Sequence, residues 1–269
     1  MSRVRPAAVS GSFYPGERVA LVRMVDHLLS EAAASAGSGP LPKAIIVPHA
    51  GYVYSGAVAA SAYAGLRGRS AGIKRVILLG PAHRLPVRGL ALPGAERFTT
   101  PLGAIDVDQD AASAIMHLPQ VTVSEPAHAR EHSLEVQLPF LQQVLKAFRI
   151  LPLAVGAVTP SEVAEVIEIL WGGPETLIVV STDLSHYLPY EAARETDGRT
   201  VEAILALDGE PVGDAEACGS ASVRGLILAA RTHRLRPQLL DLRNSGDTAG
   251  GRGEVVGYAA MAFEEPLHD

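Results

Sequence analysis

Histidine and aspartate residues follow three short apolar runs of the sequence. His49 follows the first run, His83 the second, and Asp183 and His186 the third. Imidazole and carboxylate groups are ligands for iron, zinc and copper. Two His and one anionic ligand, with coordination positions left open, form the site of non-haem iron oxygenases. These residue types therefore predict a metal site, provided that the fold brings the ends of the three runs together.

Three further residues have chemistry that suits such a site. Cys218 is the single cysteine of the chain and precedes a helical pattern. Because a helix N-terminus lowers the pKa of a thiol, we expect this residue to favour the thiolate that binds metals. Glu131 and His132 are adjacent in the sequence and offer a carboxylate and a further imidazole.

Each of these residues also has a simpler interpretation. A lone histidine is most often a hydrogen-bonded surface residue, and a free cysteine such as Cys218 is commonly a small buried hydrophobe. Asp183 lies at a strand-to-helix junction, where aspartate often caps the helix. Ser185 and His186 near Asp183 suggest a hydrolase triad, but no Gly-x-Ser-x-Gly elbow accompanies them. The metal hypothesis therefore depends on the set of residues and not on any single one.

Alternating strand and helix patterns must position these side chains. Nearly continuous apolar runs, typical of strands covered on both faces, occupy residues 43–48, 74–80 and 176–181. Helical periodicity occupies residues 16–33, 55–66, 133–147, 161–171, 190–207 and 221–232. This alternation predicts an α/β fold with a mostly parallel or mixed central sheet flanked by helices. Because ligands bind beyond the carboxyl ends of parallel strands, we expect the residues that follow the three runs to share one edge.

The length allows one large domain or two small ones, and because no linker or internal repeat divides the chain, we predict one globular domain over residues 1–269. Of its 269 residues 48% are hydrophobic and 19% charged, an ordinary globular mixture. Lys and Arg number 23 against 29 Asp and Glu, and the resulting net charge of −6 disfavours nucleic acid and anionic membranes as partners. One cysteine cannot form an intrachain disulfide, and neither a secretory signal nor a long apolar run is present. We therefore expect a cytoplasmic protein.

Ordered motifs along nearly the whole chain resemble the Memo-like family, called AmmeMemoRadiSam system protein B in prokaryotes. In chain order the motifs are Arg5-Pro6 with Gly11-Ser12-Phe13-Tyr14-Pro15, Pro48-His49-Ala50-Gly51-Tyr52 with Tyr54-Ser55-Gly56, Gly80-Pro81-Ala82-His83, Glu131-His132-Ser133-Leu134-Glu135 with Gln137-Leu138-Pro139, Ser181-Thr182-Asp183-Leu184-Ser185-His186-Tyr187, and Cys218-Gly219. A single fragment is weak evidence, whereas the ordered set is specific.

The resemblance implies a fold similar to that of class III extradiol dioxygenases, which are non-haem iron enzymes that cleave catechol rings. It implies that iron or copper is held by two His and one Cys, which are His49, His83 and Cys218 in this chain. The further pocket positions that it implies are Asp183, His186, Glu131 and His132. Prokaryotic members are often encoded beside an AMMECR1-like protein and a radical SAM protein, which implies that these are partners.

This chain departs from the family pattern after Cys218-Gly219. It continues with Ser220-Ala221-Ser222, where the family often has a basic residue and a histidine. We therefore expect different substrate contacts near the thiol. The resemblance also implies that Cys218 occupies the position where the dioxygenases use a carboxylate ligand. Thiolate is a softer and more electron-donating ligand than carboxylate, so we expect a different metal preference and redox potential.

Three functional hypotheses follow. The first is an iron-dependent redox enzyme, similar to a dioxygenase, with a small and possibly aromatic substrate; Fe(II) is the expected metal, with copper or zinc as alternatives. In this hypothesis His186, held by Asp183, acts as acid or base, and Glu131 and His132 orient substrate or water. The second is an iron- or copper-binding protein without turnover. The third is an interaction module that acts with the AMMECR1-like and radical SAM partners.

Overall fold

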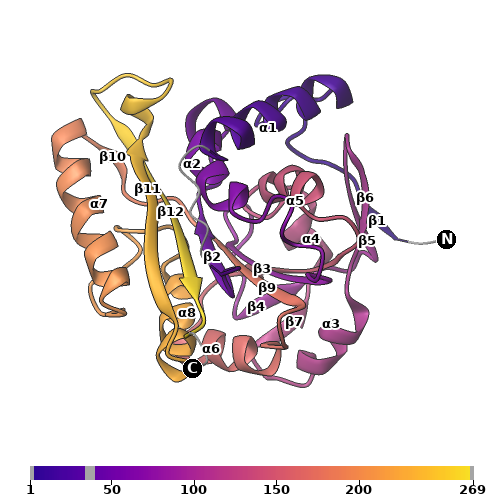
Figure 1. The fold of residues 1–269 in the computed structure, drawn as a ribbon. Coiled ribbons are helices and arrows are strands. Elements are labelled where there is room, and N and C mark those ends of the chain that lie inside the picture. The colour runs from indigo at the N-terminus through magenta and orange to yellow at the C-terminus, as the bar shows by residue number, and fades with distance from the viewer. Residues whose placement is uncertain (1–2, 34–39, 267–269) are drawn as a thin grey trace.

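The three apolar runs form neighbouring strands at the centre of a mixed sheet. In the computed structural model, which describes residues 3–33 and 40–266, these strands are β2 (Ala44–Val47), β3 (Arg75–Pro81) and β9 (Thr176–Ser181). Strand β9 lies between β2 and β3 and is parallel to both. Every residue of β2 and β9 is buried, which explains why the runs are apolar without alternation. The predicted α/β fold is confirmed (Figure 1).

The sheet extends from these strands in both directions. The order among the described strands is β10-β12-β2-β9-β3-β8-β4-β7, and β11 also pairs with β12. The added strands are β4 (Leu90–Leu92), β7 (Val121–Val123), β8 (Arg149–Val155), β10 (His186–Leu188), β11 (Arg236–Asn244) and β12 (Val255–Glu264). Strand β8 continues the parallel centre, whereas β12 and β4 are antiparallel to β2 and β8. A separate small sheet contains β1 (Val4–Arg5), β5 (Arg97–Thr100) and β6 (Gly103–Asp106).

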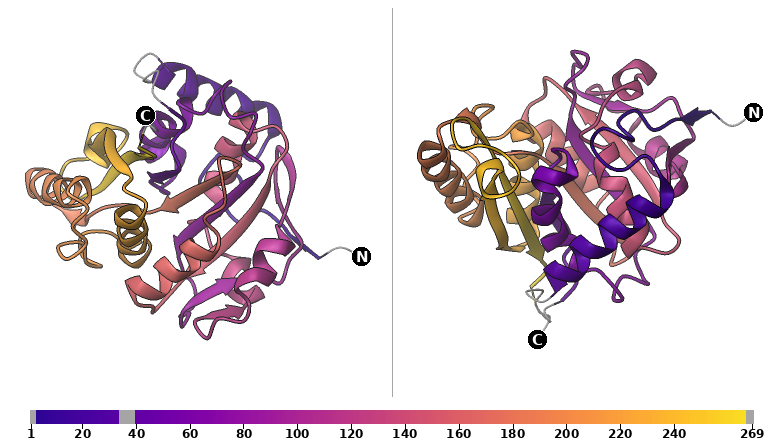
Figure 2. Two further views of the ribbon diagram at one scale, coloured as in Figure 1. Left: turned by 60° about the horizontal axis from the view of Figure 1, so that its bottom comes forward. Right: turned by 90° about the horizontal axis from the view of Figure 1, so that it is seen from above.

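Helices cover both faces of the large sheet (Figure 2). One apolar core lies under α1 (Arg18–Ala33), α2 (Tyr52–Ala64) and α5 (Leu138–Val144). A second lies under α3 (Gln109–Ile115), α6 (Pro160–Ile169), α7 (Tyr190–Leu205) and α8 (Ser220–Thr232). Alternate residues of one strand face the two cores: Ile45 and Val47 of β2 face the first, and Ala44 and Ile46 face the second. The short elements are α4 (Glu125–Ala129), η1 (Glu135–Gln137) and η2 (Ser245–Asp247).

All six predicted helical stretches contain helix, but residues 133–147 differ from the prediction. They form the 3-10 turn η1 and then α5, with Pro139 in the first turn of α5. The N–H of Ser133 is bound by the Glu131 side chain, so the chain is still a loop at that point. In the part of the chain that the structure describes, no helix is both long and apolar enough to cross a membrane.

Candidate metal centre

The parallel strands end at a common level of the sheet. Val47 of β2 is paired with Ser181 of β9, so His49 and Asp183 both lie two residues beyond a matched pair. The backbone N–H of His49 donates to Asp183 Oδ1 at 2.7 Å, which ties the two strand ends together. His83 follows the last residue of β3 by two positions at the same edge. Parallel topology thus places His49, His83 and Asp183 together.

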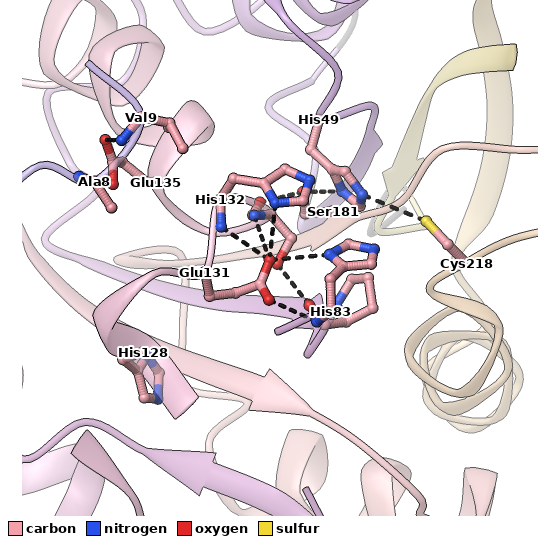
Figure 3. Close-up of polar contacts among 12 residues, drawn as sticks. Ala8, Val9, His49, His83, His128, Glu131, His132, Glu135, Ser181 and Cys218 are labelled. Atoms are coloured by element: carbon pink, nitrogen blue, oxygen red, sulfur yellow. Dashed lines mark hydrogen bonds and ion pairs between the residues drawn. The ribbon is translucent and has the colours of Figure 1, made fainter. Parts of the chain in front are cut away.

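Three imidazoles converge at this edge (Figure 3). One ring nitrogen from each of His49, His83 and His132 lies within 4.8 Å of the other two. The rings of His83 and His132 stack with centroids 4.7 Å apart, and the His49 ring lies edge-on to both. His–metal bonds of about 2.0–2.1 Å place two ligand atoms roughly 3.4 Å apart in a tetrahedral site. Small movements of these side chains would therefore bring them onto one ion.

Hydrogen bonds behind His49 determine which ring nitrogen faces the cluster. Ser181 Oγ donates to the Ser133 carbonyl at 2.6 Å and accepts from Gln137 Nε2 at 2.8 Å. Because the single hydroxyl proton is already used, the 3.0 Å contact between Ser181 Oγ and His49 Nδ1 requires the imidazole to donate. The Nε2 of His49 then carries the lone pair, which is the form required of a metal ligand.

Glu131 orients His83 in a comparable way. Its buried carboxylate accepts hydrogen bonds from the N–H of His83 at 2.6 Å and from His83 Nδ1 at 3.0 Å. It also accepts from the backbone N–H groups of His132 and Ser133, both at 2.9 Å. Burial alone would raise the pKa of Glu131, but the hydrogen bonds from His83 and Ser133 outweigh it and lower the pKa to about 2. The ionised carboxylate retains the Nδ1 proton of His83, which leaves Nε2 available to a metal.

The ring of His132 is the least satisfied of the three. Its Nδ1 is buried and has no hydrogen-bond partner among the described residues, although Glu131 Oε1 lies 3.4 Å away. Burial lowers the pKa of His132 to about 4 and that of His49 well below its usual range, so both rings are neutral at pH 7. Neutral imidazoles with an unpaired buried nitrogen fit the requirements of a metal site, because ligand nitrogens must be unprotonated.

Cys218 touches this cluster through His49. Its Sγ lies 3.4 Å from His49 Nε2 and accepts the N–H of Asp183 at 3.3 Å. Nitrogen and sulfur ligands of one tetrahedral ion are about 3.6 Å apart at ordinary bond lengths. The sulfur is therefore at ligand spacing from His49.

The protonation of Cys218 differs from the sequence-based expectation. Burial, reinforced by the nearby Asp183 carboxylate, raises the pKa of the Cys218 thiol to about 12. Helix α8 does begin two residues later, at Ser220, but desolvation outweighs the effect of its N-terminus. Without a metal ion, Cys218 is a thiol at neutral pH.

Asp183 and His186 do not form the predicted acid–base pair. The Asp183 carboxylate is bound to the His49 backbone, and no hydrogen bond joins it to His186 within the described ranges. Burial raises the pKa of Asp183 to about 7. His186 is half-buried at the start of β10 and pairs there with Val256 of β12. Asp183 thus holds the end of β2 against the end of β9. The alternative role as a helix cap does not apply, because the element that follows it is strand β10.

An amino-terminal segment fixes the loop that carries Glu131 and His132. The buried Arg5 donates to the carbonyls of His128 at 3.0 Å and Glu131 at 2.7 Å, and it pairs with the buried Glu135 carboxylate. Glu135 also accepts hydrogen bonds from Ala8, Val9 and Tyr14. Sequence reasoning gave these residues no role of their own, although Arg5 and Glu135 both lie in the motifs that resemble the family.

Comparison with known proteins decides the family. Residues 5–262 match the family model described as Memo-like protein. The chain belongs to the Memo-like family. It is similar to MEMO1 family proteins of Ignicoccus hospitalis and Aquifex aeolicus, both at 36% identity, over 98% and 97% of this chain and 99% of each relative. It is also similar to the MEMO1 family protein MTH_45 of Methanothermobacter thermautotrophicus, at 34% identity over 96% of this chain and all of the relative.

A solved structure shares the fold of this Memo-like protein. The crystal structure of uncharacterized protein JW3007 from Escherichia coli K12 aligns with a TM-score of 0.51 at 12% identity. The alignment covers 83% of this chain and 100% of the other. At this level of identity the likeness concerns the fold alone.

The departure from the family pattern after Cys218 lies at the start of α8. Gly219 is the N-cap residue of the helix, and Ser220, Ala221 and Ser222 form its first turn. The residues of α8 that directly follow the cysteine therefore have small, uncharged side chains.

Proposed function

We propose that this Memo-like protein is a non-haem metal protein, and that it is an iron-dependent oxidoreductase acting on a small, possibly aromatic substrate. The observation that carries the proposal is the convergence of three imidazoles, two of them oriented from behind by Ser181 and Glu131. Carboxylate and hydroxyl partners of this kind are typical of metal-ligating histidines. Imidazole and sulfur donors suit Fe(II), which we take as the metal, with copper or zinc as alternatives.

His49 and His83 are the first two proposed ligands, and Cys218 is the third. Two considerations support Cys218: its sulfur is at ligand spacing from His49, and the family resemblance names it. His132 is the competing third ligand, because its ring nitrogen belongs to the three-histidine cluster. If Cys218 is the ligand, His132 faces the same space and is free to contact substrate.

Two histidines of the predicted site are able to accept a proton from a substrate. Bound Fe(II) would supply open coordination positions and one-electron chemistry. His132 and His186 each have a pKa lowered by burial, so at neutral pH each imidazole can accept a proton from a substrate hydroxyl. Glu131 is fully committed to four backbone and imidazole donors, so its role is to position His83 and the loop.

A second candidate function is metal binding without turnover. The cavity beside Cys218 has a volume of about 60 Å³, whereas sites for drug-sized ligands occupy roughly 300–1,000 Å³. A cavity of this size has no room for a large substrate. It is compatible with an iron or copper carrier, which needs no substrate pocket. An interaction module working with AMMECR1-like and radical SAM proteins in the cytoplasm remains a proposal that depends on the resemblance.

Metal stoichiometry of protein purified without oxygen tests the proposal. We expect close to one iron per chain in the wild type and almost none in His49→Ala and His83→Ala. His117→Ala is the matched control, because His117 is exposed and outside the cluster. Loss of metal in Cys218→Ala with retention in His132→Ala assigns the third ligand to Cys218, and the reverse assigns it to His132.

Oxygen consumption distinguishes the two functions. The iron-loaded protein is screened against catechols and related phenols, and turnover that disappears in His49→Ala supports the enzyme. Full metal loading without turnover supports the carrier. A wild-type chain that retains no iron, copper or zinc after anaerobic titration refutes both.

A further inference from the structure

A small cavity adjoins the proposed metal site at the start of α8. It lies between the carboxyl ends of β3 and β8, at Pro81 and Val155, and the segment from Cys218 to Ser222. Its volume is about 60 Å³, about the volume that two water molecules occupy in the liquid. Cys218 belongs to both the cavity wall and the cluster, because its sulfur contacts His49 Nε2.

Ser222 lines this cavity with an unsatisfied hydroxyl. The residue is fully buried, and its Oγ has no hydrogen-bond partner among the described residues. A helical serine commonly donates to the carbonyl four residues earlier, which here belongs to Cys218, but no such bond is formed. Buried polar groups in native proteins nearly always have a partner, so the partner of this hydroxyl must come from the cavity.

Two backbone donors of the same lining segment also lack partners in the part of the chain that the structure describes. Helix α8 has 13 residues, and its N-cap Gly219 provides no side-chain cap. The N–H groups of Ala221 and Ser222 lie in its first turn, where a helix has no internal acceptor, and no other acceptor binds them among the described residues. Donor N–H groups and the positive end of the helix dipole favour an oxyanion.

One carboxylate in the cavity wall, that of Asp214, would repel a bound anion. Asp214 is exposed, and its Oδ1 accepts a hydrogen bond from Ser220 Oγ. Solvent screens the charge of an exposed carboxylate. The groups left without partners, the Ser222 hydroxyl and two backbone amides, are all able to donate.

We propose that this cavity is the subsite for the carboxylate group of a small organic acid, which would be the substrate of the proposed metal site. A carboxylate fills the available volume and offers two oxygens to the Ser222 hydroxyl and the amides of Ala221 and Ser222. Because the cavity is small, the remainder of the acid extends past Cys218 toward the imidazoles. The substrate class rests on the proposed function, whereas binding of a carboxylate does not.

Formate is the probe, titrated into the metal-free full chain at constant ionic strength maintained with chloride. Amide resonances of Ala221 and Ser222 are followed by NMR in the wild type, in Ser222→Ala, which removes the hydroxyl, and in Ser222→Val, which also fills the cavity. Ser113→Ala is the control, because this exposed helical serine lies elsewhere, on α3. We expect saturable shifts in the wild type and in Ser113→Ala, several-fold weaker binding in Ser222→Ala, and at least tenfold weaker binding in Ser222→Val.

Absence of saturable shifts in the wild type overturns the subsite, as does equal formate affinity in the wild type and Ser222→Ala. Equal binding of chloride overturns the assignment to a carboxylate. If Ser222→Val does not fold, as judged by thermal melting, Ser222→Ala decides the outcome. Because the titration uses metal-free protein, failure of the subsite and failure of the metal site are observed separately.

Discussion

Replacing Glu131 by Gln is the most direct test of how the metal centre is held together. The change keeps the shape of the side chain but substitutes an NH₂ group for one oxygen of a buried carboxylate. Oε1 accepts from His83 Nδ1 and from the N–H groups of His132 and Ser133, and Oε2 accepts from the N–H of His83. In either orientation of the amide, its NH₂ meets at least one of these donors.

The size of the effect follows from the pKa of Glu131. Its folded-state pKa is about 2 against an ordinary value of 4.5, and at about 1.4 kcal/mol per unit the ionised form contributes about 3 kcal/mol. A carboxyl with a lowered pKa stabilises the fold above its unfolded-state pKa and loses that contribution as pH falls through the folded-state pKa. The wild type therefore loses this contribution between about pH 4.5 and pH 2. The Glu131→Gln variant lacks this stabilising contribution at every pH.

Urea denaturation in the presence of EDTA measures the prediction. We expect Glu131→Gln to be about 3 kcal/mol less stable than the wild type at pH 7, with the difference shrinking as pH is lowered toward 2. Metal affinity should fall about 10–100-fold, because His83 loses the partner that orients it. Glu202→Gln, an exposed change on α7, is the control. A difference at pH 7 below about 0.5 kcal/mol, which is typical of surface changes, would refute the reasoning.

Three further predictions concern the surroundings of the cluster. In Ser181→Ala, His49 loses the acceptor that fixes its tautomer, so metal affinity measured by chelator competition should fall about 10–100-fold; an unchanged affinity would contradict the tautomer assignment. Arg5→Ala removes the cation that pairs with the buried Glu135 carboxylate, so the free energy of unfolding measured with urea should fall by about 3–5 kcal/mol. A fall of less than about 1 kcal/mol would mean that the ion pair is dispensable. If Cys218 is a ligand, binding must displace a thiol proton held with a pKa of about 12, so affinity measured by titration calorimetry should rise about tenfold per pH unit from pH 6 to 9. A flat profile would assign the third position to His132, whose pKa is about 4.

Much of the fold could be predicted because its centre is regular. The strands buried on both faces have continuous apolar sequences, and helices with one apolar face alternate with them. Placement of His49, His83 and Asp183 at one edge follows from the rule for parallel strand ends. Short strands such as β4 and β7 could not be predicted, since three residues carry too little periodicity and pair only through tertiary structure.

Other features of the site depend on contacts that sequence spacing does not reveal. The ring of His132 reaches the cluster because Arg5 and Glu135 hold its loop, and these contacts join residues more than 120 positions apart. The raised pKa of Cys218 arises from burial, which the helix rule does not include. Asp183 binds the His49 backbone and not the His186 ring because strand register, and not proximity in sequence, sets its neighbours.

The contacts of Arg5 also determine when the site is completed during synthesis. The carbonyl of Glu131 to which Arg5 binds lies 126 residues further along the chain. Arg5 therefore leaves the ribosome long before the carbonyl that it binds has been synthesised. Closing so long a loop is slow compared with forming local helices. A nascent chain presents His49 and His83 first and acquires an ordered His132 only later. A bulky amino-terminal fusion that keeps Arg5 from docking would leave the sheet intact and the third imidazole loose.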